Sequence, residues 1–190
     1  MGSYRQFGVT VMQILAGVGA GPKGDFESIA TYSSINGLNS VTFSSIPQTF
    51  KHLQIRTSTV ATTDGYIESR FNTDSGSNYA WHILTGQGSA ASSSAQTSQT
   101  KLRITGFNNQ MDTTNPYVSI TDIFDYTNTN KYTTIRTLSG KDSNGAGDIN
   151  LISGVWLNSA AVTTIEFFLG STSGKTYLTG SHIALYGIKG

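Results

Sequence analysis

The segment 142–148 contains the residue types that could hold a metal ion. Asp142, Asn144 and Asp148 supply side-chain oxygens around glycines, and oxygen-rich loops that contain Gly bind calcium. The segment lacks the spacing and the final bidentate Glu of the helix–loop–helix calcium motif. A hairpin turn at Asn144-Gly145 explains the same residues equally well. Calcium therefore remains an alternative at this position, and we expect no other cofactor.

Residues suited to acid–base or nucleophilic catalysis are present without a recognisable arrangement. His52, His82 and His182 fall in different predicted strands, so each would be an isolated base or ligand. Asp122 and Asp125 could form the carboxylate pair of a glycoside hydrolase, but a spacing of three in a strand directs them to opposite faces. The chain has no Cys and no G-x-S-x-G motif. We expect no catalytic residue and no enzymatic activity.

Two glycine-rich segments match phosphate-binding motifs only in part. Residues 19–24 fit G-x-G-x-x-G, and residues 170–176 resemble a P-loop that is one residue short. Both are followed by strand-like sequence, whereas these motifs require a helix. Lys and Arg are scattered and the net charge is +1, which disfavours nucleic acid as a partner. We find no apolar run long enough for a membrane span and expect no membrane partner.

Aromatic side chains are the remaining candidates for ligand contact. The chain has nine Tyr, nine Phe and two Trp residues. Trp81, with Tyr79 two residues before it, lies in a strand pattern where core packing is the simplest interpretation. Aromatic residues near the loops of a β-sandwich can also stack on sugar rings or pack between subunits. Trp81 and Tyr79 are therefore candidate glycan or interface residues.

The elements that would position these residues are short β-strands. Runs of β-branched and aromatic residues recur between Gly, Asn, Asp and Ser, with no long helical pattern, which is typical of strands. A period of two is visible at Leu53 and Ile55 and again from Tyr117 to Asp122. The predicted strands span 26–32, 41–45, 52–60, 66–71, 79–84, 101–104, 117–126, 132–139, 148–157, 162–169 and 177–188.

Turn residues and connection lengths predict how these strands pair. Turns are expected at Asn36-Gly37, Asp64-Gly65, Asp74 to Gly76 and Asn144-Gly145. No helix-length crossover is present, so we expect antiparallel pairing. The spacing fits a sandwich, a jelly roll or a barrel. We predict an all-β domain over residues 25–190, an antiparallel jelly-roll-like β-sandwich. The low-complexity segment 86–100 is interpreted as a surface loop, or as a loop that is ordered only against a partner.

Residues 1–24 differ from the rest of the chain. An apolar segment, 7–15, precedes a Gly-rich segment, 16–24. We predict an extended N-terminal arm joined by a flexible linker to the β-domain. Such an arm can add a strand to the sheet edge of a neighbouring subunit. The predicted partner-binding residues of the arm are Phe7, Val9, Val11, Ile14 and Leu15.

The composition indicates a neutral, polar surface. Charged residues make up 12% of the chain, about half of the roughly 25% found in typical domains. Ser and Thr together supply 50 of the 190 residues. A surface of this kind offers little electrostatic repulsion against self-association, and it also suits hydrogen bonding to glycans.

Several segments, taken in order, resemble small β-rich structural proteins of tailed bacteriophages, especially cyanophages and other phages of aquatic bacteria. The resemblance covers roughly residues 25–189. It is carried by Phe-Glu-Ser-Ile-Ala-Thr at 26–31, Phe-Ser-Ser-Ile-Pro at 43–47, Lys-His-Leu-Gln-Ile-Arg at 51–56, Asp-Ile-Phe-Asp-Tyr at 122–126, Asn-Lys-Tyr-Thr-Thr-Ile-Arg at 130–136 and the terminal Ile-Ala-Leu-Tyr-Gly-Ile-Lys at 183–189.

The resemblance implies a non-enzymatic component of the virion that decorates the capsid or forms part of a fibre or tail appendage. It implies a homo-oligomer, for which we expect a trimer, that packs against other virion proteins such as capsid or tail subunits. The alternative is a lectin-like β-sandwich module that binds carbohydrate on the host surface. Neither expectation brings a set of catalytic residues.

Overall fold

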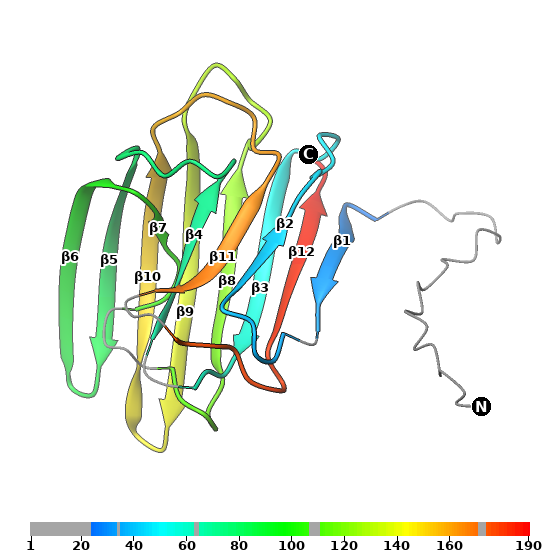
Figure 1. Cartoon of the computed structure of the whole chain (residues 1–190). Helices are drawn as coiled ribbons and strands as arrows, with labels where there is room; N and C mark the ends of the chain where they lie inside the picture. The colour runs from blue at the N-terminus through cyan, green and yellow to red at the C-terminus, as the bar shows by residue number, and fades with distance from the viewer. Residues whose placement is uncertain (1–23, 34, 63–64, 107–110, 171–173) are drawn as a thin grey trace, which may run out of the picture.

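The structure, a computed structural model, describes residues 24–33, 35–62, 65–106, 111–170 and 174–190, and these residues form two packed antiparallel sheets (Figure 1). The twelve strands are β1 (Phe26–Tyr32), β2 (Ser40–Phe43), β3 (His52–Thr59), β4 (Tyr66–Phe71), β5 (Tyr79–Gln87), β6 (Ala90–Gln99), β7 (Leu102–Arg103), β8 (Tyr117–Phe124), β9 (Thr133–Ser143), β10 (Ala146–Trp156), β11 (Ile165–Gly170) and β12 (His182–Ile188). The predicted all-β sandwich is confirmed.

The strand order is that of a jelly roll with a widened sheet. The eight-stranded sheet runs β1-β12-β3-β8-β9-β10-β5-β6, and the four-stranded sheet runs β2-β11-β4-β7. The first four strands of the large sheet and all four of the small sheet make the two interlocked Greek keys of a jelly roll. Two insertions, β5–β6 and β9–β10, continue the large sheet beyond this core. We call these four strands the extension.

The extension includes the clearest departure from the sequence-based prediction. The segment 86–100 was expected to be a loop, but most of it is β6, which pairs with β5 in an antiparallel hairpin. Every residue of β6 except the last is exposed, because β6 forms the outer edge of the large sheet and the small sheet does not reach it (Figure 1). A strand with no buried side chain has no hydrophobic alternation, which explains why the sequence pattern was misleading.

The apolar core lies between the two sheets. Leu53, Ile55 and Ile123 of the large sheet face Ile67 and Phe167 of the small one, and all five are at most 1% exposed. The predicted alternation at Leu53 and Ile55 is therefore confirmed, since both side chains point inward. Burial of these aliphatic and aromatic groups is the main favourable contribution to folding.

At one end of the sandwich the core is aromatic. Trp156, at the end of β10, contacts Phe71 edge-on at 5.7 Å and stacks on Tyr79 at 6.4 Å between ring centroids. Its indole Nε1–H donates to Asp74 Oδ2 at 2.7 Å. Asp74 also accepts from the Gly76 amide at 2.8 Å, as expected for the turn predicted there. This arrangement ties the extension strand β10 to the connection between β4 and β5.

Part of the buried face of β8, β9 and β10 is polar. Thr57 shares a hydrogen bond of 2.7 Å with Ser119, and Thr121 shares one of 2.9 Å with Thr137. All four residues are at most 4% exposed. Neighbouring strands thus satisfy each other's hydroxyl groups, which keeps the cost of burying them low. At Ser119 and Thr121 the inward positions of β8 are therefore polar, while Val118 and Ile120 beside them point outward.

Three carboxylates give the fold an acid-sensitive component. Hydrogen bonds from Lys131 and Lys51 lower the pKa of Asp125 to about 2. Burial would raise the pKa of Asp112, but Lys141 and the Thr114 amide outweigh burial and lower it. Burial would also raise the pKa of Asp74, but hydrogen bonds from the Trp156 indole and other donors outweigh burial and lower it. Each carboxylate therefore stabilises the folded chain in its ionised form.

We therefore expect the free energy of unfolding to fall on acidification. A carboxylate with a depressed folded pKa contributes fully above its unfolded pKa, 3.8 for Asp125, and the contribution disappears as the pH falls to about 2. Urea unfolding between pH 5 and pH 2 measures this loss. Asp125→Asn should flatten the curve in that window. An unchanged pH dependence in this variant would show that Asp125 makes no such contribution.

The predicted arm residues Phe7, Val9, Val11, Ile14 and Leu15 lie outside the described residues. The described chain begins at Gly24, just before β1, at the edge of the large sheet opposite β6. In the part of the chain that the structure describes, no helix is long and apolar enough to cross a membrane.

Candidate functional site

The outer face of the large sheet carries a row of exposed apolar side chains. Ile120 of β8 lies opposite Leu138 of β9, Leu138 lies opposite Leu151 of β10, and Leu151 lies opposite Leu84 of β5. These four side chains, the leucine row, are 44–53% exposed. They come from four adjacent strands and stand side by side, because residues in register share one face of a sheet.

A second row, which we call the glycine row, runs beside the first. Val118 of β8 lies opposite Gly140 of β9, Gly140 opposite Ile149 of β10, and Ile149 opposite Gly86 of β5. A Cβ on Gly140 would come within 2.5 Å of the Asp148 backbone oxygen, and one on Gly86 within 3.2 Å of the Ile149 side chain. The two glycines thus leave space on either side of Ile149.

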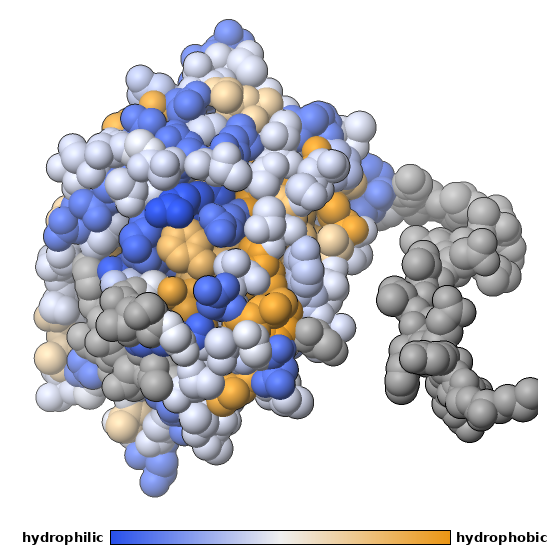
Figure 2. Space-filling model, viewed as in Figure 1, coloured by the Kyte–Doolittle hydropathy of each residue, from blue (hydrophilic) through white to orange (hydrophobic). Residues whose placement is uncertain are grey.

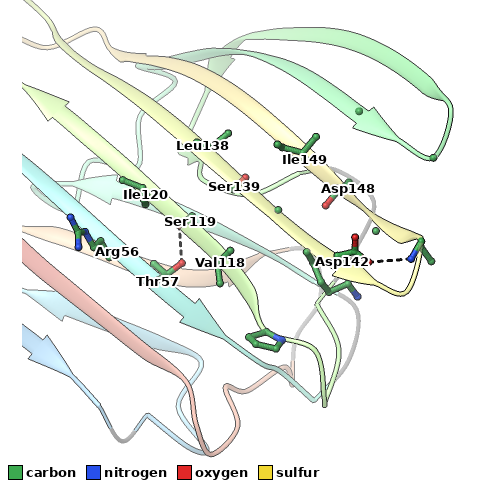
Figure 3. A pocket seen from close by; sticks show the side chains of 18 residues that line it. Arg56, Thr57, Val118, Ser119, Ile120, Leu138, Ser139, Asp142, Asp148 and Ile149 are labelled. Atoms are coloured by element: carbon green, nitrogen blue, oxygen red, sulfur yellow. Dashed lines mark hydrogen bonds between the residues drawn. The ribbon is translucent and has the colours of Figure 1, made fainter.

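Residues of both rows line a hollow of about 790 Å³. In Figure 3, Val118, Ile120, Leu138 and Ile149 project from adjacent strands around it. A second hollow of about 530 Å³ lies over β10, β5 and β6, and Leu84 and Leu151 form part of its wall. The leucine row is therefore a ridge of four large side chains, and the groove of the glycine row is confined to Gly140 and Gly86, on either side of the exposed Ile149.

The two rows lie mainly on the extension. Only β8 belongs to the jelly-roll core, whereas β9, β10 and β5 are inserted strands. The buried hydroxyl groups beneath β8 and β9 show why the apolar residues point outward there, since the inward positions are already filled by polar residues with partners. The extension contributes Trp156, Tyr79 and Ile135 to the core, and it provides most of the exposed apolar surface.

Charges of both signs border the rows. Asp122 lies opposite both Gln54 and Arg136 in register, and it accepts a hydrogen bond from Gln54 at 2.8 Å. Arg56, next to Ile120 in register, lies over the rings of Phe26 and Tyr186 at 5.1 and 5.3 Å. The apolar surface therefore has a mixed, neutral border.

The opposite side of the molecule is different in character. Figure 2 shows the side of the small sheet, where hydrophobic residues gather in a limited patch within a largely hydrophilic surface. Phe168 of β11 lies under Arg70 and Lys101, at 4.9 and 5.5 Å from their charged groups. Cationic side chains thus cover the aromatic ring on this side, whereas Arg56 and Arg136 lie at the border of the leucine row.

The candidate calcium ligands do not converge. Asp142 pairs with Gly147, and Asp148 pairs with Lys141. Asp142 is therefore on the outer face, where it accepts from the Gly145 amide at 3.1 Å, while Asp148 is buried and accepts from Tyr117 at 2.7 Å. Asn144 and Gly145 have φ values of 56° and 90°, as a two-residue hairpin turn requires. The structure therefore shows the hairpin turn and places Asp142 and Asp148 on opposite faces of the sheet.

The candidate glycan residues are also corrected. Tyr79 is fully buried, and Trp81 is 4% exposed. Trp81 points inward, where Arg103 lies 5.6 Å from its ring centroid, and Tyr79 donates to the Asp74 backbone oxygen at 3.1 Å. Neither ring presents a face to a sugar. Core packing, the simpler interpretation of Trp81, is what the structure shows.

The remaining candidates for chemistry lie apart. His52 Nδ1 accepts from the Asp125 amide at 3.0 Å, while His82 and His182 lie on other strands. Asp122 and Asp125 bind different partners, Gln54 and the pair Lys51 and Lys131. Within the described ranges, no three His, Cys, Asp or Glu side chains are grouped as metal ligands.

Comparisons of this chain with protein families, with curated proteins and with solved structures find no match.

The leucine and glycine rows were missed in the sequence analysis. The alternation from Tyr117 to Asp122 was recognised, but it does not say which set faces inward. A signal was present in the pairs Val118–Ile120 and Ile149–Leu151, which repeat the same i, i+2 apolar spacing. Only the strand order brings these pairs, Leu84 and Leu138 together on one face.

Proposed function

We propose that this chain is a non-enzymatic structural component of a bacteriophage virion. It would decorate the capsid or form part of a fibre or tail appendage, pack against other subunits and be anchored by its N-terminal arm. The resemblance of residues 25–189 to phage structural proteins supports the class of protein. The jelly-roll topology is compatible with it, because capsid and lectin domains both use this fold.

The observation that carries the proposal is the apolar outer face of the large sheet. Its six aliphatic side chains are 44–59% exposed. Together they expose on the order of 500 Å², near the upper end of the roughly 300–600 Å² that the largest patch of a monomer reaches. A patch of this size in a chain with few charges favours packing against protein. The lectin-like alternative loses its two candidate aromatic residues, since Tyr79 and Trp81 are buried.

Quantitative mass spectrometry of purified particles tests the proposal. The copy number of this chain is scaled to that of the major capsid protein. A ratio that is a fixed fraction of the capsid lattice would identify a decoration protein, and a few copies per particle would identify a fibre or tail component. Absence from particles would reject the proposal.

Removing residues 1–24 should prevent the chain from joining the particle while leaving the β-domain folded. The strands and the core begin at Phe26, so the deletion leaves both complete. We expect at least a tenfold drop in copies per particle, since an arm that adds a strand supplies much of the contact with its partner. Circular dichroism and thermal unfolding provide the folding control. Undiminished incorporation of a folded deletion variant would argue against the arm as the anchor.

A further inference from the structure

We propose that two copies of this chain pack face to face through the outer surface of the large sheet, with the leucine row of each copy in the glycine row of the other. This inference rests on the proposed structural function and names one contact within it. The occupant of the surface is a second copy of the same chain.

The shape of the surface is self-complementary. The ridge formed by the leucine row and the groove of the glycine row run side by side across the same strands, two residues apart on each strand. Two residues along a strand span about 6.6 Å. A two-fold axis between the rows and parallel to them therefore sets the ridge of each copy over the groove of the other. It places Leu138 over Gly140 and Leu84 over Gly86 of the second copy, and it brings Ile120 against Val118 and Leu151 against Ile149.

The area of the surface is suited to a stable pair. A specific interface buries about 800 Å² on each partner. The six aliphatic side chains provide on the order of 500 Å² of apolar area, and the neutral border around them provides the remainder. An apolar centre with a polar border is the usual anatomy of such an interface.

The charges around the rows permit this contact. Arg56, Arg136, Asp122 and Asp142 flank the rows, which makes two charges of each sign. A border of one sign would repel its own copy across a two-fold axis, whereas a balanced border does not. The rows themselves contain no charged residue.

The ridge and groove also favour two copies over three. A two-fold contact is isologous, so one copy fills the whole groove and inserts its whole ridge at the same time. Around a three-fold axis, each copy would have to divide this face between two neighbours. The pair proposed here thus differs from the trimer that the resemblance implies.

The test compares three variants of the full chain by sedimentation equilibrium and light scattering. Leu138→Ser removes a side chain from the centre of the ridge, and we expect it to raise the dissociation constant of the pair at least tenfold. Leu157→Ser is the matched control, because Leu157 follows the end of β10, is 43% exposed and belongs to neither row, and we expect no change. Thermal unfolding shows that each variant is folded.

The Gly86→Val variant tests whether the affinity of the pair depends on the shape of the surface or only on its apolar area. It adds apolar area but fills the groove, and the nearest side chain to a Cβ there is Ile149 at 3.2 Å. The proposal requires this variant to weaken the pair at least tenfold. A surface that associates through apolar area alone, without a matching shape, would instead bind more tightly.

Several outcomes would overturn the inference. The inference fails if the chain has the mass of a monomer at concentrations up to about 100 μM, or the mass of a trimer. It also fails if Leu138→Ser leaves the dissociation constant of the pair unchanged, or if Gly86→Val lowers it. If the chain is monomeric in solution but Leu138→Ser lowers its copy number in particles, the surface contacts another virion protein. In that case the inference fails and the proposed structural function stands.

Discussion

Trp156→Ala is expected to lower the free energy of unfolding by about 3–5 kcal/mol, the usual cost of truncating a fully buried Trp. Trp156 is 1% exposed and contacts the rings of Phe71 and Tyr79. Its loss leaves a cavity between β10 and the small sheet, and it removes the indole donor to Asp74 Oδ2. Urea and thermal unfolding monitored by circular dichroism measure the change.

One further variant separates the contribution of the indole N–H from that of the ring, and a second variant is a control. Trp156→Phe keeps an aromatic ring but loses the N–H, so it should cost less, about 1–3 kcal/mol. Tyr132→Ala removes a ring that is 53% exposed, and it should change stability by no more than about 0.5 kcal/mol. If Trp156→Ala were as stable as the parent chain, the aromatic end of the core would not support the extension.

Tyr117→Phe is expected to cost about 2–3 kcal/mol, although it removes a single oxygen atom. The Tyr117 hydroxyl donates to Asp148 Oδ1 at 2.7 Å and accepts from Asn150 Nδ2 at 2.7 Å and the Gly106 amide at 3.2 Å. Burial, followed by the interaction with Asp148, raises the pKa of Tyr117 well above its usual value, so the hydroxyl keeps its proton. Its removal leaves three buried polar groups without this partner.

The effect of Tyr117→Phe should be concentrated under the glycine row. Asp148 and Asn150 flank Ile149 on β10, and Thr85 donates to Asn150 Oδ1 at 2.6 Å. We therefore expect faster amide hydrogen exchange in β8, β10 and β5 than in β2 and β11. Tyr132→Phe is the control, since that hydroxyl belongs to an exposed side chain. Equal stability of Tyr117→Phe and the parent chain would rule out the Tyr117 hydroxyl as the centre of this network.

Several β-strands of the jelly roll could be predicted because β-branched and aromatic residues recur in them between turn residues. The strands 26–32 and 66–71 were predicted with the bounds that the structure shows, and the hairpin turn at Asn144-Gly145 has the two positive φ values that its residues favour. In such segments, local propensity, alternation and turn chemistry agree. The ends of other strands, such as β9, were displaced because the hairpin continues beyond the apolar residues.

The candidate surface could not be predicted, for two physical reasons. Alternation in β8 does not reveal that Tyr117, Ser119 and Thr121 point inward, since a hydroxyl group can be buried when a neighbouring strand satisfies it. The rows also join residues that are far apart in sequence, such as Leu84 and Leu138, through a strand order in which β10 lies beside β5. That order depends on long-range pairing, which the sequence pattern does not encode locally.

The residues suggested for ligand contact were also misplaced in the sequence analysis, for a related reason. Tyr79 and Trp81 share the spacing of a strand with one exposed face, but their face is the inward one. Asp142 and Asp148 are close in sequence, and the hairpin directs them to opposite sides of the sheet.

The way in which the extension is inserted has a consequence for how this architecture can vary. β5–β6 and β9–β10 enter the chain as antiparallel hairpins between strands of the jelly roll, and each hairpin widens the large sheet by about 9–10 Å. The two hairpins are not equivalent, because β9–β10 lies between β8 and β5, so β5–β6 reaches the large sheet only through β10. The width of the exposed face thus depends on the order in which the hairpins are added, and Trp156 and Tyr79 join that added width to the core.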